Sequence, residues 1–132
     1  IFMLFKGLSA TFSTKGADQY NTIGKFWDFM SNIYGMENLR GLGYNWTDDS
    51  IEYVIGLEKN EPLNVNNTDL QKIGIDAVYK EISIPEKGWE IYKGKTDELQ
   101  SIYDKIYSKG PLSYEIERFT NDGNCTIEFI RK

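Results

Sequence analysis

The chain contains no histidine and only one cysteine, Cys125. Histidine is the side chain that most often exchanges protons near neutral pH, and cysteine and histidine supply most structural zinc ligands. The sequence therefore excludes ordinary zinc sites and catalysis by Ser–His or Cys–His pairs. It also carries no cofactor motif, so we expect no metal and no cofactor. Any chemistry has to use carboxylates, tyrosines and lysines.

A secretory leader and long apolar runs are missing as well. No apolar stretch is long enough to span a bilayer, so we expect no membrane partner. A single cysteine in a chain without a leader favours a reducing, cytoplasmic setting. The chain begins at Ile1 and not at a methionine, which leaves open whether a DNA-binding segment precedes it.

Basic residues are outnumbered, with 15 lysines and arginines against 20 aspartates and glutamates and a net charge of -5. The basic residues form no local cluster along the chain. We therefore expect no direct binding of nucleic acid by this domain, because a negative field repels phosphates. The same field favours cationic partners.

Aromatic residues are plentiful: nine tyrosines, seven phenylalanines and three tryptophans make up 14% of the chain. Phenylalanine is sufficient to fill a core, whereas tyrosine and tryptophan carry a polar group that needs a partner when buried. The excess of tyrosine therefore indicates a semi-polar cavity.

The order of predicted elements occurs twice. The first unit, about 1–58, reads as a strand at 4–8, a helix at 20–34, and strands at 39–46 and 51–57. The helix shows apolar residues at spacings of three and four, and the last strand alternates apolar and polar residues. Gly41 and Gly43 allow a close approach or a bulge in the strand at 39–46.

The second unit, about 76–132, reads as a strand at 89–92, a helix at 97–107, and strands at 113–119 and 125–130. Between the units, the polar segment of about 59–75 is interpreted as a linker. The sequence thus predicts one α+β domain, residues 1–132. We expect duplicated strand-helix-strand-strand units with pseudo-twofold symmetry, forming an antiparallel sheet with two helices and a central ligand cleft.

Several short motifs of the two units form a recognisable set. In the second unit these are the run IPEKGWEIY at 84–92, IERF at 116–119 and IEFI at 127–130. In the first unit they are GLSA at 7–10 and YVIGL at 53–57. Together these motifs resemble the GyrI-like effector-binding domain of the AraC-type superfamily. The resemblance covers nearly the whole chain, although the motifs are short.

This resemblance implies a duplicated fold whose central cleft senses lipophilic cations, as in multidrug recognition, with a buried glutamate among aromatic rings. Glu117 stands at the position of that glutamate. Phe119 stands where the family more often has tyrosine, and Trp89 replaces a tyrosine common in the first strand of the second repeat. Relatives of this kind are attached to DNA-binding modules and regulate transcription.

Strand alternation in 112–119 adds an independent argument. Glu115 and Glu117 share one face, and Tyr114, Ile116 and Arg118 share the other. If the second face packs on the helices, both glutamates point into the cleft, and Arg118 has to extend to its rim. The alternative is that both glutamates are solvated on an exposed sheet face.

Buried among aromatic rings, an ionised glutamate is costly unless a positive charge arrives, and ring faces attract cations as well. We expect ligand binding by Glu117 or Glu115 together with aromatic wall residues. The wall candidates are Tyr34, Tyr44, Trp46, Tyr53, Trp89 and Tyr92.

The sequence favours a non-catalytic domain that binds small amphipathic, cationic or aromatic molecules. It would act as a stand-alone sensor or sequestering protein, or as the effector domain of a transcriptional regulator. The alternative is a hydrolase of reactive electrophiles with Glu117 as general base. A module that inhibits a protein partner through its acidic surface is the third hypothesis. The ligand's identity, and whether the protein is a monomer or a dimer, stay open.

Overall fold

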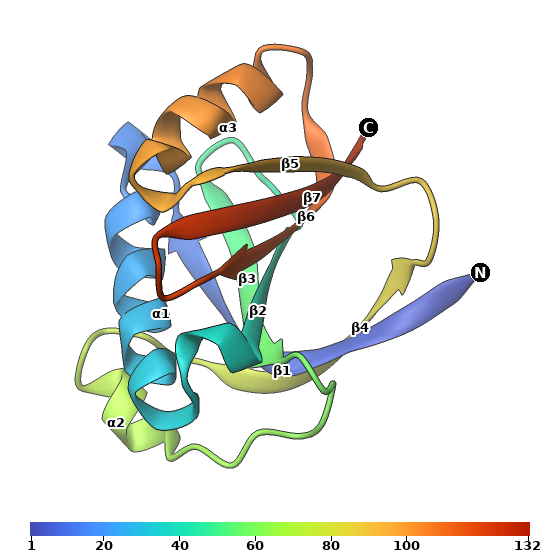
Figure 1. Ribbon diagram of the computed structural model, residues 1–132. Helices are drawn as coiled ribbons and strands as arrows, with labels where there is room; N and C mark the ends of the chain where they lie inside the picture. The colour runs from blue at the N-terminus through green and yellow to red at the C-terminus, as the bar shows by residue number, and fades with distance from the viewer.

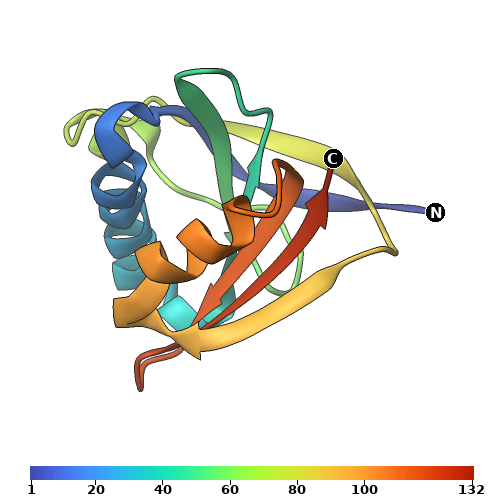
Figure 2. The same cartoon turned by 90° about the horizontal axis from the view of Figure 1, so that it is seen from above.

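The computed structural model describes residues 1–132 and is an α+β fold, as the sequence predicts. A seven-stranded antiparallel sheet has the strand order β4-β1-β3-β2-β6-β7-β5. The helices α1 and α3 lie on one side of it (Figures 1 and 2). None of the helices combines the length and the apolarity needed to cross a bilayer.

The N-terminal elements are β1 (Phe2–Ser13), α1 (Gln19–Tyr34), β2 (Leu39–Tyr44) and β3 (Ser50–Leu57). The short helix α2 (Asn67–Gln71) and strand β4 (Val78–Pro85) follow. The C-terminal elements are β5 (Glu90–Lys95), α3 (Leu99–Tyr107), β6 (Leu112–Phe119) and β7 (Asn124–Arg131). Three 3-10 turns occupy Lys15–Ala17, Met36–Asn38 and Thr96–Glu98.

The helix α2 corrects the expectation of two helices and a plain linker at 59–75. The side chain of Asn66 accepts a hydrogen bond of 2.9 Å from the Thr68 N–H and so caps the helix. Leu70 is fully buried in the main core. One capped turn and one buried leucine are sufficient to fix a helix of five residues, but they give no amphipathic pattern that is visible in the sequence.

The main core lies between the sheet and the helices. Helix α1 buries Phe26, Trp27 and Met30, and α3 buries Ile102, Tyr103 and Ile106. These positions recur every three or four residues, so each helix presents one apolar face to the sheet.

A second, smaller core lies on the other face of the sheet, which no long helix covers. Phe5, Leu42, Val54, Ile84 and Ile116 are almost completely buried there. They are buried because the sheet is strongly curved. Its two edge strands, β4 and β5, are consecutive in the chain and are joined by the turn 86–89.

The length of this turn explains the curvature. Opposite edges of a flat seven-stranded sheet would lie about 29 Å apart. The chain from Pro85 to Glu90 can span at most about 17 Å. The edges must therefore approach each other, and Figures 1 and 2 show the connection closing one end of the curved sheet.

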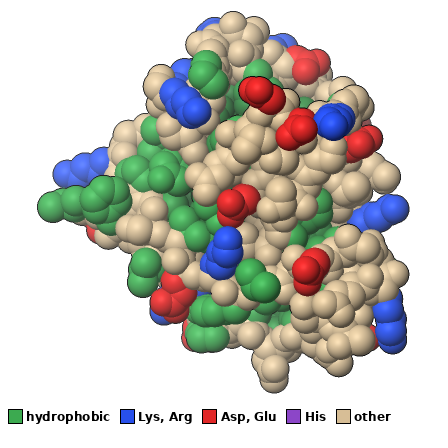
Figure 3. Space-filling model, turned by 180° about the vertical axis from the view of Figure 1, so that it is seen from behind, with side chains coloured by type: hydrophobic (Ala, Val, Ile, Leu, Met, Phe, Trp, Pro, Cys, Tyr) green, Lys and Arg blue, Asp and Glu red, His purple; other side chains and the backbone are tan.

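The N-terminal end of β1 projects beyond the rest of the sheet. Here β1 pairs with β4 alone, because its pairing with β3 begins at Leu8. Ile1 and Phe2 are 92% and 64% exposed. Figure 3 shows this projecting hydrophobic end and, elsewhere on the same face, acidic and basic groups that are interspersed. That face therefore carries no large surface of one charge.

Alanine substitutions at two glycines, one in a strand and one in a helix, test the packing. A methyl group on Gly56 of β3 would overlap the backbone carbonyl of Lys6, whereas one on Gly24 of α1 would meet open space. We expect Gly56→Ala to lower the free energy of unfolding by about 1–3 kcal/mol. Gly24→Ala should raise it by up to about 1 kcal/mol, because alanine is the better helix former. Urea unfolding of both variants measures this, and a Gly56→Ala protein as stable as the wild type would contradict the packing.

Candidate functional site

A cavity of about 230 Å³ lies between the sheet and the helices α1 and α3, and eighteen residues line it. Seven of these residues are aromatic: Tyr20, Trp27, Trp46, Tyr53, Tyr103, Tyr107 and Phe119. Three are acidic, namely Asp28, Glu115 and Glu117, and none is lysine or arginine. The cavity is thus a ring-lined space with acidic groups and no basic side chain.

Glu117 of β6 is buried at the centre of a hydrogen-bond network. Its carboxylate accepts one hydrogen bond from the Tyr53 hydroxyl and another, of 2.8 Å, from the Tyr103 hydroxyl. The Tyr53 oxygen in turn accepts a hydrogen bond of 2.8 Å from the indole N–H of Trp27. Strand β3 and both long helices therefore position this one carboxylate.

Glu115 lies two residues earlier on the same face of β6, and it is also buried. The Tyr107 hydroxyl donates to it over 3.5 Å, which is at the outer limit for a hydrogen bond. Glu115 therefore has weaker support from donors than Glu117. The oxygens of Glu115 can therefore accept further hydrogen bonds.

Two glycines of β2 make room for these groups, and of the close approach or bulge that the sequence allowed there, the structure has the close approach. Gly41 pairs with Glu117 and Gly43 with Glu115 across the β2–β6 ladder. A methyl group on Gly41 would overlap the Tyr53 hydroxyl, and one on Gly43 would come within 2.7 Å of Glu115 Oε1. The floor of the cavity thus requires glycine at both positions.

Burial determines the protonation of the two acids. The pKa of Glu115 is raised to about 8, mainly by loss of solvation and in addition by the neighbouring Glu117 carboxylate, against the opposing effect of the Tyr103 and Tyr107 hydroxyls. Burial also raises the pKa of Glu117, against the hydrogen bonds from Tyr53 and Tyr103. At neutral pH the pair therefore retains a proton.

The surrounding tyrosines remain protonated and act as donors. Burial, together with the charge of Glu115, raises the pKa of Tyr20 to about 12. Burial likewise raises the pKa of Tyr53, Tyr103 and Tyr107 above the usual tyrosine value. The phenols can therefore orient the carboxylates but cannot supply a positive charge to them.

The structure brings together four of the eight residues predicted to bind ligand. Glu117, Glu115, Tyr53 and Trp46 all line the cavity. Tyr53 reaches it because its strand position faces the helices. Trp46 reaches it from the loop between β2 and β3.

The other four predicted residues lie elsewhere. Tyr44 and Trp89 belong to the second core on the opposite face of the sheet, where the Trp89 indole donates to the Pro85 carbonyl over 2.8 Å. Tyr92 of β5 lies opposite Ile127 and packs against the main core outside the cavity. The Tyr34 hydroxyl accepts a hydrogen bond of 3.1 Å from the Asn64 N–H.

The helices supply cavity residues that the sequence argument omitted, chiefly Trp27, Tyr103 and Tyr107. The helical pattern places all three on apolar faces, but the expected cleft lay on the sheet face away from the helices. The available signal was the use of tyrosine at 103 and 107, because a helix that only packs against a sheet needs no phenol hydroxyl.

The expected orientation of β6 was also reversed. The face with Glu115 and Glu117 packs toward the helices, whereas Tyr114 and Ile116 belong to the opposite core. Accordingly, Arg118 does not extend to the rim of the cavity.

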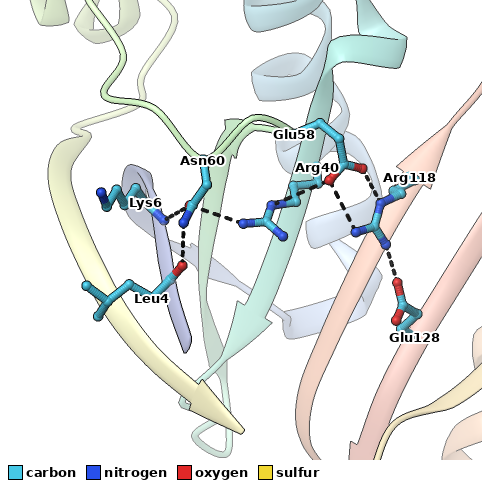
Figure 4. A network of polar contacts seen from close by, with 7 residues as sticks. All are labelled: Leu4, Lys6, Arg40, Glu58, Asn60, Arg118 and Glu128. Carbon is cyan, nitrogen blue, oxygen red and sulfur yellow. Dashed lines mark hydrogen bonds and ion pairs between the residues drawn. The ribbon is translucent and has the colours of Figure 1, made fainter. Parts of the chain in front are cut away.

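Arg118 instead bonds Glu58 and Glu128 on the opposite face (Figure 4). Arg40 joins this network through Glu58, at 4.0 Å, and donates to the Asn60 side chain over 3.1 Å. The arginines of the central strands are therefore paired on the face away from the cavity.

No protein-family model and no curated protein matches this chain. No group of three or more Cys, Asp or Glu side chains is arranged to hold a metal ion. The features that bear on function are therefore the cavity and its two buried carboxylates.

The buried pair predicts a pH-dependent stability. The pKa of Glu115 is about 4.5 when unfolded and about 8 when folded, so folding takes up protons between these values. Stability is then highest below the unfolded pKa and is lost as the pH rises toward 8. We expect the free energy of unfolding to fall by up to about 1.4 kcal/mol per pH unit for each proton.

Urea titrations between pH 5 and pH 8.5 measure this slope, and histidine cannot contribute to it because the chain has none. Glu115→Gln should flatten the profile, whereas Glu61→Gln, which removes an exposed acid, should leave it unchanged. A wild-type profile that is flat across this range would contradict the protonation of the pair.

Proposed function

We propose that the chain is a GyrI-like effector-binding domain that binds small amphipathic cations in this cavity. The observation that carries the proposal is a pair of buried carboxylates in an aromatic cavity without a basic residue. An unpaired buried carboxylate is costly, and a cationic ligand supplies the missing counter-charge. The aromatic rings add cation–π attraction of about 0.5–2 kcal/mol each.

The topology supports the duplication that this family would have. The order strand-helix-strand-strand occurs as β1-α1-β2-β3 and again as β5-α3-β6-β7. Within the sheet, the sets β1-β3-β2 and β5-β7-β6 meet where β2 pairs with β6. This pair is antiparallel, as a pseudo-twofold axis between β2 and β6 requires. The proposed axis passes beside the two glycines and the two glutamates.

A domain of this kind would report or sequester its ligand. A cation beside the pair favours loss of the retained proton, so its affinity would rise with pH as the second carboxyl ionises. The same domain would serve a transcriptional regulator if a DNA-binding module is attached, or a stand-alone sensor if none is.

Acridine orange, a planar dye cation, tests the proposal. We expect saturable binding in calorimetry, with quenching of tryptophan fluorescence because Trp27 and Trp46 line the cavity. Glu117→Gln should weaken binding by about tenfold or more, since a desolvated charge–charge contact is lost. Glu61→Gln is the control of equal charge change at an exposed site. Absence of binding, or equal affinity in Glu117→Gln and the control, would contradict the proposal.

A hydrolase is the second candidate, and the pKa of Glu115, about 8, favours it. A carboxylate of that pKa is a suitable general base near neutral pH. Our proposal of a binding domain predicts no turnover of styrene oxide, an aromatic epoxide, above the uncatalysed rate. Mass spectrometry measures the diol product. Turnover that Glu115→Gln or Glu117→Gln abolishes, while Glu61→Gln retains it, would favour the hydrolase instead.

A further inference from the structure

The two glutamates of the cavity differ in the hydrogen bonds that they receive. Both line the cavity, and Glu115 and Glu117 keep 4% and 5% of their surface exposed, so a ligand can contact either one. Glu117 accepts hydrogen bonds from the hydroxyls of Tyr53 and Tyr103. Glu115 accepts one from Tyr107 alone, over 3.5 Å. Because donors to a carboxylate favour its ionised form, the surroundings of Glu117 stabilise a negative charge better than those of Glu115.

The geometry also directs the nearby phenol protons to Glu117. A tyrosine hydroxyl has a single proton to donate. Tyr103 lies close to both acids, and it donates this proton to Glu117 over 2.8 Å. The Tyr53 oxygen accepts from the Trp27 indole, so the proton of Tyr53 stays directed at Glu117. Glu115 therefore cannot share the donors that support its neighbour.

These contacts assign the proton that the pair retains to Glu115. Two residues on one face of a strand are about 7 Å apart, and no basic side chain lines the cavity to offset a second negative charge. The pKa of Glu115, about 8, agrees with this assignment. The bonds to the two carboxyl groups come from tyrosines and not from each other. The O–H of a protonated Glu115 is thus available to an occupant of the cavity.

We infer that the cavity takes a singly charged cation with a hydrogen-bond acceptor, such as a carbonyl oxygen, beside the charged group. Glu117 is the counter-ion of this ligand, and Glu115 donates a hydrogen bond to its acceptor as a neutral acid. The inference rests on the proposed function and narrows its ligand class. A doubly charged ligand would need both acids ionised, and a cation without an acceptor would leave the Glu115 O–H unpaired, at a cost in free energy.

Phenyltrimethylammonium and its 3-acetyl derivative test this ligand class. Both carry a permanent charge and no N–H, and only the derivative has a carbonyl oxygen. We expect wild-type protein at pH 6.5 to bind the acetyl derivative more tightly by about fivefold, since one hydrogen bond is added. Calorimetry measures both affinities.

Substitutions at the two acids separate their roles. Glu115→Gln keeps an N–H donor at this position and should bind both ligands within about twofold of wild type. Glu115→Met removes the donor at similar size, so it should retain the affinity for phenyltrimethylammonium and lose the preference for the acetyl derivative. Glu117→Gln should weaken both ligands by about tenfold or more. Glu61→Gln, at an exposed site, should change neither affinity.

The preference should also depend on pH, because Glu115 loses the donated proton when it ionises. At pH 9, above the pKa of Glu115, wild-type protein should lose the preference and Glu115→Gln should keep it. The strand neighbours Gly43 and Phe129 carry no charge, and Asp28 is the third acid of the cavity. The other titratable groups that act on Glu115 are Glu117 and four tyrosines whose pKa values are raised: Tyr20, Tyr53, Tyr103 and Tyr107.

The outcomes distinguish this inference from the proposed function. If wild-type protein binds neither these ligands nor acridine orange, the proposed function itself fails. If acridine orange binds in a manner that depends on Glu117, but the acetyl derivative is not preferred, only the inference is overturned. A loss of both ligands in Glu115→Gln as large as that in Glu117→Gln would also overturn it, because both acids would then act as counter-ions.

Discussion

The burial of the Glu117 carboxylate beneath two helices is the interaction on which the cavity depends. Its position is set by Tyr53 from β3 and Tyr103 from α3, and Trp27 from α1 holds Tyr53. Gly41 of β2 leaves the space that the Tyr53 hydroxyl occupies. Five elements therefore meet at one acidic group, and desolvation there sets the charge state of the whole cavity.

The two faces of the sheet differ in whether their carboxylates are paired with cations. On the outer face, Arg40 and Arg118 form ion pairs with Glu58 and Glu128. On the face toward the helices, Glu115 and Glu117 have phenols but no cation. Because strand neighbours alternate between faces, Glu117 and Arg118 are adjacent in sequence yet belong to these two separate environments. The cavity is thus lined by no lysine or arginine side chain of the protein itself.

Local patterns were sufficient to predict much of this arrangement. Alternation placed Glu115 and Glu117 on one face, and helical spacing identified α1 and α3. Alternation alone could not decide which face of β6 meets the helices, since Tyr114 and Ile116 are as apolar as a helix-facing pair would be. The curvature imposed by the turn 86–89 is a property of strand order, which no local pattern encodes. With that curvature, Tyr44 is buried in a second core and Trp89 packs against it, away from the cavity.

The same turn has a mechanical consequence. The strands β1–β4 and β5–β7 are held together by the β2–β6 hydrogen bonds in the middle of the sheet and by four residues of chain between its outer strands. The two halves of the sheet are therefore connected at two places, and they cannot move apart without breaking the β2–β6 hydrogen bonds. A ligand of the proposed kind would therefore have to enter by movement of side chains or helices and not by opening of the sheet.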